Sequence, residues 1–282
     1  MDFIAPANAR YGQGSGTTMI DSANSSRSHA YPEVRIGGFM TIAATRQQLA
    51  DLMVEHCLAA RAQSHAPLAP KLVFSSNGQG IAYAGENAEF ARAMAQADVI
   101  HADGMSVVNA SRVLTRTPLP ERVATTDFFH DAATAALKAG LRFYVLGGKE
   151  SQNREATEAM QRLYPGLQIA GRRNGYFNPD EDADVCKGIV DSGADVLWVG
   201  LGKPKQELWS VANRERLRGV GWLKTCGGLY SFLAGDSPRA PGWMQAAGLE
   251  WLYRASLEPR RLGPRYLLTN PQSIYRMVRY SG

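Results

Sequence analysis

A short stretch rich in glycine, lysine and amide side chains, residues 200–207, holds the residue types best suited to chemistry in this chain. It reads Gly-Leu-Gly-Lys-Pro-Lys-Gln-Glu, follows the apolar run Asp195–Val199 and leads into a helical pattern. Glycines after a parallel strand let the backbone approach a ligand, and amides at a helix start favour anions. An ordinary strand-to-helix turn is the alternative. We expect these residues to contact an anionic ligand, with Gln206 orienting a carboxylate or hydroxyl: Gly200, Gly202, Lys203 and Gln206.

Asp103 is the second candidate for chemistry. It comes directly after the apolar run Val99–Ala102 and beside Gly104, where a carboxylate can face an open crevice. Two interpretations stand equal on position alone: Asp103 caps a helix that starts near Met105, or it is a catalytic base.

Gly147 and Gly148 follow a third expected strand and could cradle a diphosphate. The surrounding residues match neither the GxGxxG nor the GxxxxGK[ST] pattern, so a dinucleotide or ATP site is only weakly supported. The five histidines show no metal-ligand spacing, and we expect His101 to point into a sheet layer. No GxSxG elbow marks a hydrolase. We therefore expect neither a metal nor a cofactor.

Strand and helix patterns alternate along most of the chain, which predicts a Rossmann-like α/β fold. This fold has a mainly parallel sheet with helices on both faces, and ligands bind at the carboxyl ends of its strands. We expect a first strand over Val34–Met40 and a helix over Asn87–Gln96, with Asp127 and Ser151 as caps of later helices. The predicted boundaries are a disordered segment at 1–32, an α/β domain at 33–247 and a helical basic appendage at 248–282.

The formal net charge of +5 resides in the C-terminal region, because residues 251–282 hold six arginines and one acidic residue. Aromatic and aliphatic side chains alternate there with the arginines, a pattern that suits a membrane interface. A packing helix with a solvated basic face is the alternative. Nucleic acid is not expected, since the rest of the chain offers no basic groove. No apolar run is long enough to cross a bilayer, no secretory signal is evident, and the three separated cysteines suit a reducing cytoplasm.

Several short motifs occur in a fixed order: Ser75-Ser76-Asn77, Ala102-Asp103-Gly104, Arg122 with Asp127, Leu146-Gly147-Gly148, Tyr164-Pro165-Gly166, Gly175-Tyr176-Phe177, residues 200–207, Arg239-Ala240-Pro241 and Glu250–Arg254. In this order and spacing the chain resembles the WecG/TagA/CpsF family of bacterial glycosyltransferases from about Val34 to Tyr266. Ser75 stands where the family usually has threonine, and Ala124 where glycine is common. Residues 1–32 lie outside the resemblance.

The resemblance implies transfer of a hexose from a UDP-sugar to a saccharide on polyprenyl diphosphate, with inversion and a β linkage, in bacterial exopolysaccharide or cell-envelope polymer biosynthesis. It implies that Asp103 is the general base, that Ser75 and Asn77 line the sugar pocket, and that Gln206 lies near the reacting sugar. Arginines are the implied diphosphate contacts: Arg122, Arg254, Arg261 and Arg265. The expected location is cytoplasmic, peripheral on the inner face of the plasma membrane, and a second copy of the chain is a further candidate partner.

Two other classes of protein remain open at this point. One is a non-catalytic nucleotide-binding membrane scaffold with the same fold, and the other is a Rossmann oxidoreductase or methyltransferase. The missing dinucleotide fingerprint disfavours the second. The joint presence of Asp103, Asn77 and Gln206 disfavours the first, because a scaffold would not need all three. The sequence leaves the donor sugar, the acceptor sugar and the polymer open.

Overall fold

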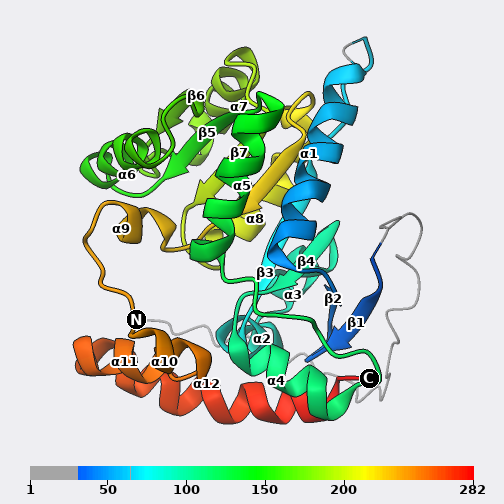
Figure 1. Ribbon diagram of the computed structural model, residues 1–282, viewed down its shortest axis with the longest axis vertical. Helices are drawn as coiled ribbons and strands as arrows, with labels where there is room; N and C mark the ends of the chain where they lie inside the picture. The colour runs from blue at the N-terminus through cyan, green and yellow to red at the C-terminus, as the bar shows by residue number, and fades with distance from the viewer. Residues whose placement is uncertain (1–30, 64) are drawn as a thin grey trace, which may run out of the picture. The chain divides into compact units, whose positions relative to one another are not determined.

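Six parallel strands form the central sheet, in the order β4-β3-β8-β7-β5-β6 (Figure 1). The computed structural model describes residues 31–63 and 65–282, so the disorder predicted for 1–32 falls almost wholly outside the described residues. The strands are β3 (Lys71–Ser76), β4 (Val99–Ala102), β5 (Arg142–Gly147), β6 (Gln168–Arg173), β7 (Val196–Gly200) and β8 (Trp222–Thr225). Every residue of β4, β7 and β8 is buried, as expected for strands covered on both faces.

Helices cover both faces of this sheet, which confirms the predicted α/β class. One core gathers side chains from α1 (Arg46–Ala62), α5 (Thr125–Ala139) and α6 (Glu150–Leu163) against the sheet. The other core gathers side chains from α2 (Gly78–Glu86), α3 (Ala88–Ala95), α4 (Met105–Leu114), α7 (Asp182–Asp191) and α8 (Lys205–Ala212). In Figure 1 α1 and α5 lie together in front of the sheet.

The single strand predicted over Val34–Met40 is wrong. The segment is a two-stranded antiparallel hairpin, β1 (Glu33–Ile36) and β2 (Phe39–Ile42), apart from the main sheet. Gly37 and Gly38 form its turn with φ angles of 59° and 94°, in the left-handed region that glycine tolerates best. Two consecutive glycines in an apolar run were the available signal for a turn.

The structure differs from expectation at the starts of three helices. A helix that we did not predict, α2 (Gly78–Glu86), begins directly after Asn77, whose side chain caps it. Asp127 and Ser151 are not caps, because α5 starts after Ala124 and α6 after Lys149, so both residues lie inside the first turn. A short 3₁₀ turn, η1 (Pro179–Glu181), leads directly into α7. A second 3₁₀ turn, η2 (Arg214–Leu217), precedes β8.

The C-terminal region is helical, as predicted, and it belongs to the same compact unit as the sheet. Its helices are α9 (Leu229–Leu233), α10 (Gly242–Ala246), α11 (Glu250–Leu257) and α12 (Pro259–Arg279). The long helix α12 packs along α2 and also meets α4 (Figure 1). Of the helices that the structure describes, none combines the length and hydrophobicity needed to cross a bilayer.

Gly147 is required by the close approach of β5 and β7. Its φ is 126°, and a Cβ there would lie 2.2 Å from the carbonyl oxygen of Gly200. Because both contacting groups are backbone, neither can move without displacing a strand.

We predict that Gly147→Ala lowers the free energy of unfolding by about 3 kcal/mol or more, from strain and overpacking. Gly188→Ala is the matched control, because Gly188 lies in α7 with nothing within 4 Å of the added Cβ. There alanine should stabilise the protein by about 0.5–1 kcal/mol. Urea unfolding of both variants is the measurement, and equal effects would contradict this account.

Candidate active site

A large cleft opens at the carboxyl edge of the sheet. It has a volume of about 1710 Å³, and residues that follow all six parallel strands line it. Most of the predicted site residues meet in this cleft: Ser75, Asn77, Asp103, Arg122, Gly148, Gly200, Gly202, Lys203, Gln206, Arg254 and Arg265. Gly147 is not among the lining residues. The side chain of Arg261 lies outside the described part of the chain. The structure shows this convergence, and the chemical roles of the residues remain predictions.

Asp103 is held at the end of β4 by two neighbouring elements. The Thr125 N–H, at the start of α5, donates to Asp103 Oδ1 at 2.7 Å, and Asn77 Nδ2 donates to Oδ2 at 3.1 Å. The alternative of a cap on the helix near Met105 is wrong, because Gly104 is the N-cap of α4 and no side chain caps that helix. Asp103 instead accepts a hydrogen bond from the backbone N–H of Thr125, the first residue of α5.

The electrostatics around Asp103 favour the carboxylate form. Burial alone would raise the pKa of Asp103, but the hydrogen bonds from Thr125 and Asn77 and the Lys224 ammonium bring this pKa below its ordinary value. The group is therefore ionised at neutral pH and can accept a proton. A lowered pKa makes it a weaker base, so positioning must contribute to any proton transfer.

Asn77 connects the loop after β3 to the end of β4, and Lys203 connects β3 to the loop after β7. Asn77 Oδ1 accepts from the Gly80 N–H at 3.0 Å, so one amide both caps α2 and holds Asp103. Lys203 Nζ donates to the carbonyl of Ser75 at 3.3 Å and lies 3.6 Å from Glu207 Oε1. These two contacts fix the position of the Lys203 ammonium in the lining of the cleft.

Gln206 is almost completely buried, with 1% of its surface exposed, and it joins two loops at the cleft. Its Nε2 donates to Glu207 Oε1 at 2.8 Å, and its Oε1 accepts from the Gly227 N–H at 3.1 Å. Both ends of the amide are thus engaged within the protein. Gln206 fixes the relation between the β7–α8 and β8–α9 turns, and its contact with a sugar stays a prediction.

The glycines after β5 also have partners within the protein. The Gly148 N–H donates to the Gly200 carbonyl at 3.1 Å, and the Gly148 carbonyl accepts from the Gly175 N–H at 2.9 Å. Since this Gly148 amide is already bonded, a diphosphate would have to use other groups of the same loop. The sequence pattern could not show this, because the bond joins two distant turns.

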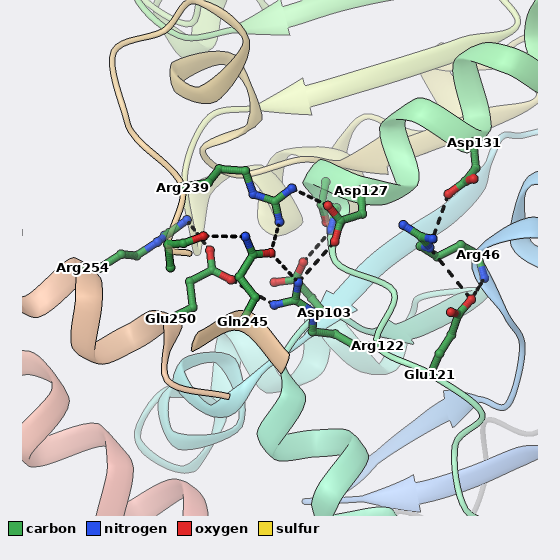
Figure 2. Close-up of polar contacts among 12 residues, drawn as sticks. Arg46, Asp103, Glu121, Arg122, Asp127, Asp131, Arg239, Gln245, Glu250 and Arg254 are labelled. Carbon is green, nitrogen blue, oxygen red and sulfur yellow. Dashed lines mark hydrogen bonds and ion pairs between the residues drawn. The ribbon is translucent and has the colours of Figure 1, made fainter. Parts of the chain in front are cut away.

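Arginines and carboxylates form a connected network at one side of the cleft (Figure 2). The Arg122 guanidinium donates to Asp127, Glu250 and Gln245 at 3.2, 2.9 and 3.2 Å. Arg239 donates to Asp127 and also to Gln245, and Arg254 lies 3.5 Å from Glu250. The network joins α5, α10 and α11, so the start of the predicted appendage is bonded to the α/β domain.

Sequence reasoning missed Lys224, which is fully buried in β8. Burial lowers the pKa of Lys224 to about 8, against the opposing effect of the Asp103 carboxylate. A lysine in the middle of the apolar run Trp222–Thr225 was the signal for an unusual residue. His101 is fully buried as expected, and burial lowers its pKa to about 3, so it is neutral.

Metal-ligating side chains do not gather in the described part of the chain. Within residues 31–63 and 65–282 no group of three or more histidine, cysteine, aspartate or glutamate side chains is arranged to hold a metal ion. The three cysteines are buried and free.

An all-parallel sheet with a polar cleft at its carboxyl edge defines an α/β protein that binds its ligands at this edge. Residues 14–281 match the model of the Glycosyl transferase WecG/TagA/CpsF family, so the chain belongs to this family. The match begins upstream of the Val34 expected from the motifs and continues beyond Tyr266. It therefore includes part of the segment 1–32 that we expected to lie outside.

We predict that Asp127→Asn lowers the free energy of unfolding by about 2 kcal/mol at pH 7, because Arg122 and Arg239 lose a partly buried partner. Burial would raise the pKa of Asp127, but Arg239 and Arg122 lower it overall. The stabilisation is therefore complete above the unfolded-state pKa of about 3.9 and is lost as the pH falls through the folded-state value.

Urea unfolding at pH 7 and at acidic pH measures this difference. Glu158→Gln is the control, since its pair with Arg162 is exposed and should contribute less than about 0.5 kcal/mol. A difference for Asp127→Asn that stayed constant down to acidic pH would contradict the electrostatic explanation.

Proposed function

We propose that this protein is an inverting glycosyltransferase that moves a hexose from a UDP-sugar to a saccharide carried on polyprenyl diphosphate. Family membership supports glycosyl transfer in general, and the family resemblance supports these substrates and a β linkage. The candidate hexoses are glucose, N-acetylmannosamine, its uronic acid and glucuronic acid. The cleft exceeds the roughly 300–1,000 Å³ of ordinary small-molecule sites, which suits a donor and an acceptor together.

The observation that carries this proposal is the ionised Asp103 carboxylate fixed at the cleft by Thr125 and Asn77. An inverting transfer needs one base that takes the proton of the acceptor hydroxyl while this oxygen attacks the anomeric carbon. The bond to the UDP oxygen breaks on the opposite face, through a transition state with oxocarbenium character. In this mechanism Asp103 receives the proton, and Ser75 and Asn77 lie beside it to line the sugar pocket.

The departing UDP carries two phosphates whose charge must be stabilised. Cationic side chains line the cleft for this role: Arg122, Lys149, Lys203, Lys205, Arg254 and Arg265. Arg122 and Arg254 both contact Glu250 in this structure, so a diphosphate that bound them would compete with that carboxylate. We propose that these cations stabilise the leaving group without a metal ion.

We also propose that residues 248–282 dock on the cytoplasmic face of the plasma membrane. An apolar stripe runs along the outer face of α12, and its exposed fractions are 78% for Leu267, 69% for Leu268, 58% for Ile274, 63% for Tyr275 and 64% for Val278. The opposite face of α12 packs on α2 with Ser273 and Met277 buried. Arginines beside the stripe would add about 1 kcal/mol each near anionic lipid.

Asp103→Asn should lower turnover by roughly 10²–10⁴-fold, because the amide keeps the shape of the carboxylate but accepts no proton. Binding of the UDP-sugar donor, measured by calorimetry, should stay close to the wild type. Turnover near the wild-type value would show that Asp103 is not the base. An inactive wild type that binds the donor would favour the scaffold alternative, and a response to NADH or S-adenosylmethionine would favour the Rossmann enzymes.

EDTA should leave the transferase rate unchanged within about twofold if lysines and arginines stabilise the leaving UDP. The measurement is the rate with EDTA, and again after addition of magnesium or manganese. A rate abolished by EDTA and restored by either ion would contradict the proposal that cationic side chains suffice.

Leu267→Ser combined with Leu268→Ser should abolish flotation with anionic liposomes while the fold persists, because both side chains are exposed. Leu58→Ser combined with Leu163→Ser is the control, since these exposed leucines lie on α1 and α6. Truncation before Gly248 is a poorer test, because it would also remove the Arg122–Glu250 contact and the packing on α2. Equal flotation of the two double variants would contradict a role for the stripe.

A further inference from the structure

Lys224 occupies an unusual position for a cation, in the centre of the parallel sheet. It is fully buried, and its register partners are Val73 on β3 and Trp198 on β7. Removing an ammonium group from water costs several kcal/mol unless charges or dipoles compensate for the loss of hydration. The loss of hydration at Lys224 must therefore be offset by its neighbours, or Lys224 must contribute to the function of the adjacent cleft.

The contacts of Lys224 lead directly to Asp103. Its Nζ donates to the carbonyl of Thr225 and lies 3.5 Å from the hydroxyl oxygen of Thr125. The backbone N–H of the same Thr125 donates to Asp103 Oδ1 at 2.7 Å. Thr125 therefore connects the buried ammonium to the carboxylate in the cleft. Among the acidic groups that act on the charge of Lys224, Asp103 has the largest effect.

Two other titratable groups near Lys224, His101 and Cys226, do not change charge near neutral pH. His101 is neutral because burial lowers its pKa to about 3, and the Cys226 thiol is neutral because burial raises its pKa to about 12. Lys203 and Glu207 lie 3.6 Å apart and largely offset each other. The pKa of Lys224 is about 8, so Lys224 carries a charge at pH 7 and loses it above pH 8.

We propose that Lys224 is a positioning residue for Asp103: its buried ammonium holds Thr125 in place, and the backbone N–H of Thr125 orients the carboxylate. This inference rests on the proposed function only in that Asp103 is taken as the base. Its consequence is an alkaline limb near pH 8 in the pH–rate profile, caused by loss of the Lys224 proton and not by Asp103.

The direct test measures protonation and needs no transferase activity. The Asp103 carboxyl carbon and the Lys224 ε-carbon are followed by NMR against pH in the wild type. In Lys224→Met, a variant of similar length without charge, the pKa of Asp103 should rise. In Asp103→Asn, a change at the cleft that leaves the sheet core intact, the pKa of Lys224 should fall, because coupling between two sites is reciprocal.

The kinetic test compares pH–rate profiles. Lys224→Met should lose the alkaline limb and should be about tenfold slower at pH 7, a smaller loss than in Asp103→Asn because the base remains. Lys71→Met is the matched control: Lys71 begins β3 at the opposite end of that strand from the cleft and pairs with Asp98 at 3.7 Å. It should leave the profile unchanged.

The outcomes separate the inference from the proposed function. An Asp103 pKa that is the same in Lys224→Met and the wild type, or a Lys224 pKa unchanged in Asp103→Asn, overturns the inference. If Lys224→Met does not fold, the Asp103→Asn titration alone decides. Reciprocal shifts in a protein that transfers no sugar would support the coupling and reject the proposed function.

Discussion

The two hydrogen bonds that fix the Asp103 carboxylate are the interaction on which the rest of the site depends. The two oxygens of this carboxylate bond elements that are distant in sequence, the Asn77 side chain after β3 and the Thr125 amide at the start of α5. Asn77 reaches Asp103 because β3 and β4 are adjacent parallel strands whose carboxyl ends lie at one edge. Thr125 reaches it because the Val123 N–H donates to the carbonyl of Ala102, the last residue of β4, at 2.7 Å. The bonds from Asn77 and Thr125 lower the pKa of Asp103 against the effect of burial. The same two hydrogen bonds to Asp103 therefore connect separate elements of the fold and set the charge of the proposed base.

The C-terminal helices connect to the cleft by two routes, one of which leads to this carboxylate. Helix α12 packs along α2, and α2 begins at Asn77, which holds Asp103. Helices α10 and α11 reach the cleft through Gln245 and Glu250, which contact Arg122 (Figure 2). If the outer face of α12 docks on a membrane, as proposed, the first route connects the docked helix to Asp103 through α2 and Asn77. A membrane-bound acceptor would then meet a site whose walls include the docking helices.

Much of the architecture could be predicted from sequence, because the buried strands are nearly continuous apolar runs and the turns after them are marked by glycine or polar residues. The hairpin of β1 and β2 was missed because seven apolar-rich residues were taken as one strand across Gly37 and Gly38. Helix α2 was missed because its start, Gly78-Gln-Gly80, resembles a turn. It packs against α12, which is far away in sequence, and tertiary packing supplies most of the stability of short helices.

The residues of the candidate site could be predicted from the sequence, but the hydrogen bonds among them could not. Position after a strand identified Asp103 and Gln206 as polar residues at the ligand edge. Whether their groups are free or bonded depends on contacts between loops, such as Gln206 with Gly227 or Gly148 with Gly200. Lys224 was overlooked because the strand was predicted from its apolar neighbours, and one charged residue does not change that prediction. A charged residue within a buried strand is nevertheless more informative about function than the apolar residues around it.

The proposed reaction is the transfer of a hexose in this cleft to a lipid-diphosphate saccharide with inversion. The most direct measurement is mass spectrometry, with NMR of the new linkage, on a synthetic lipid-diphosphate saccharide incubated with the protein and each of several UDP-sugars. The account predicts a product heavier by one hexose-type residue from one donor, with a β-configured new bond. An α-linked product would contradict inversion at Asp103, and release of UDP and free sugar with no labelled lipid from any donor would contradict transfer to this acceptor class.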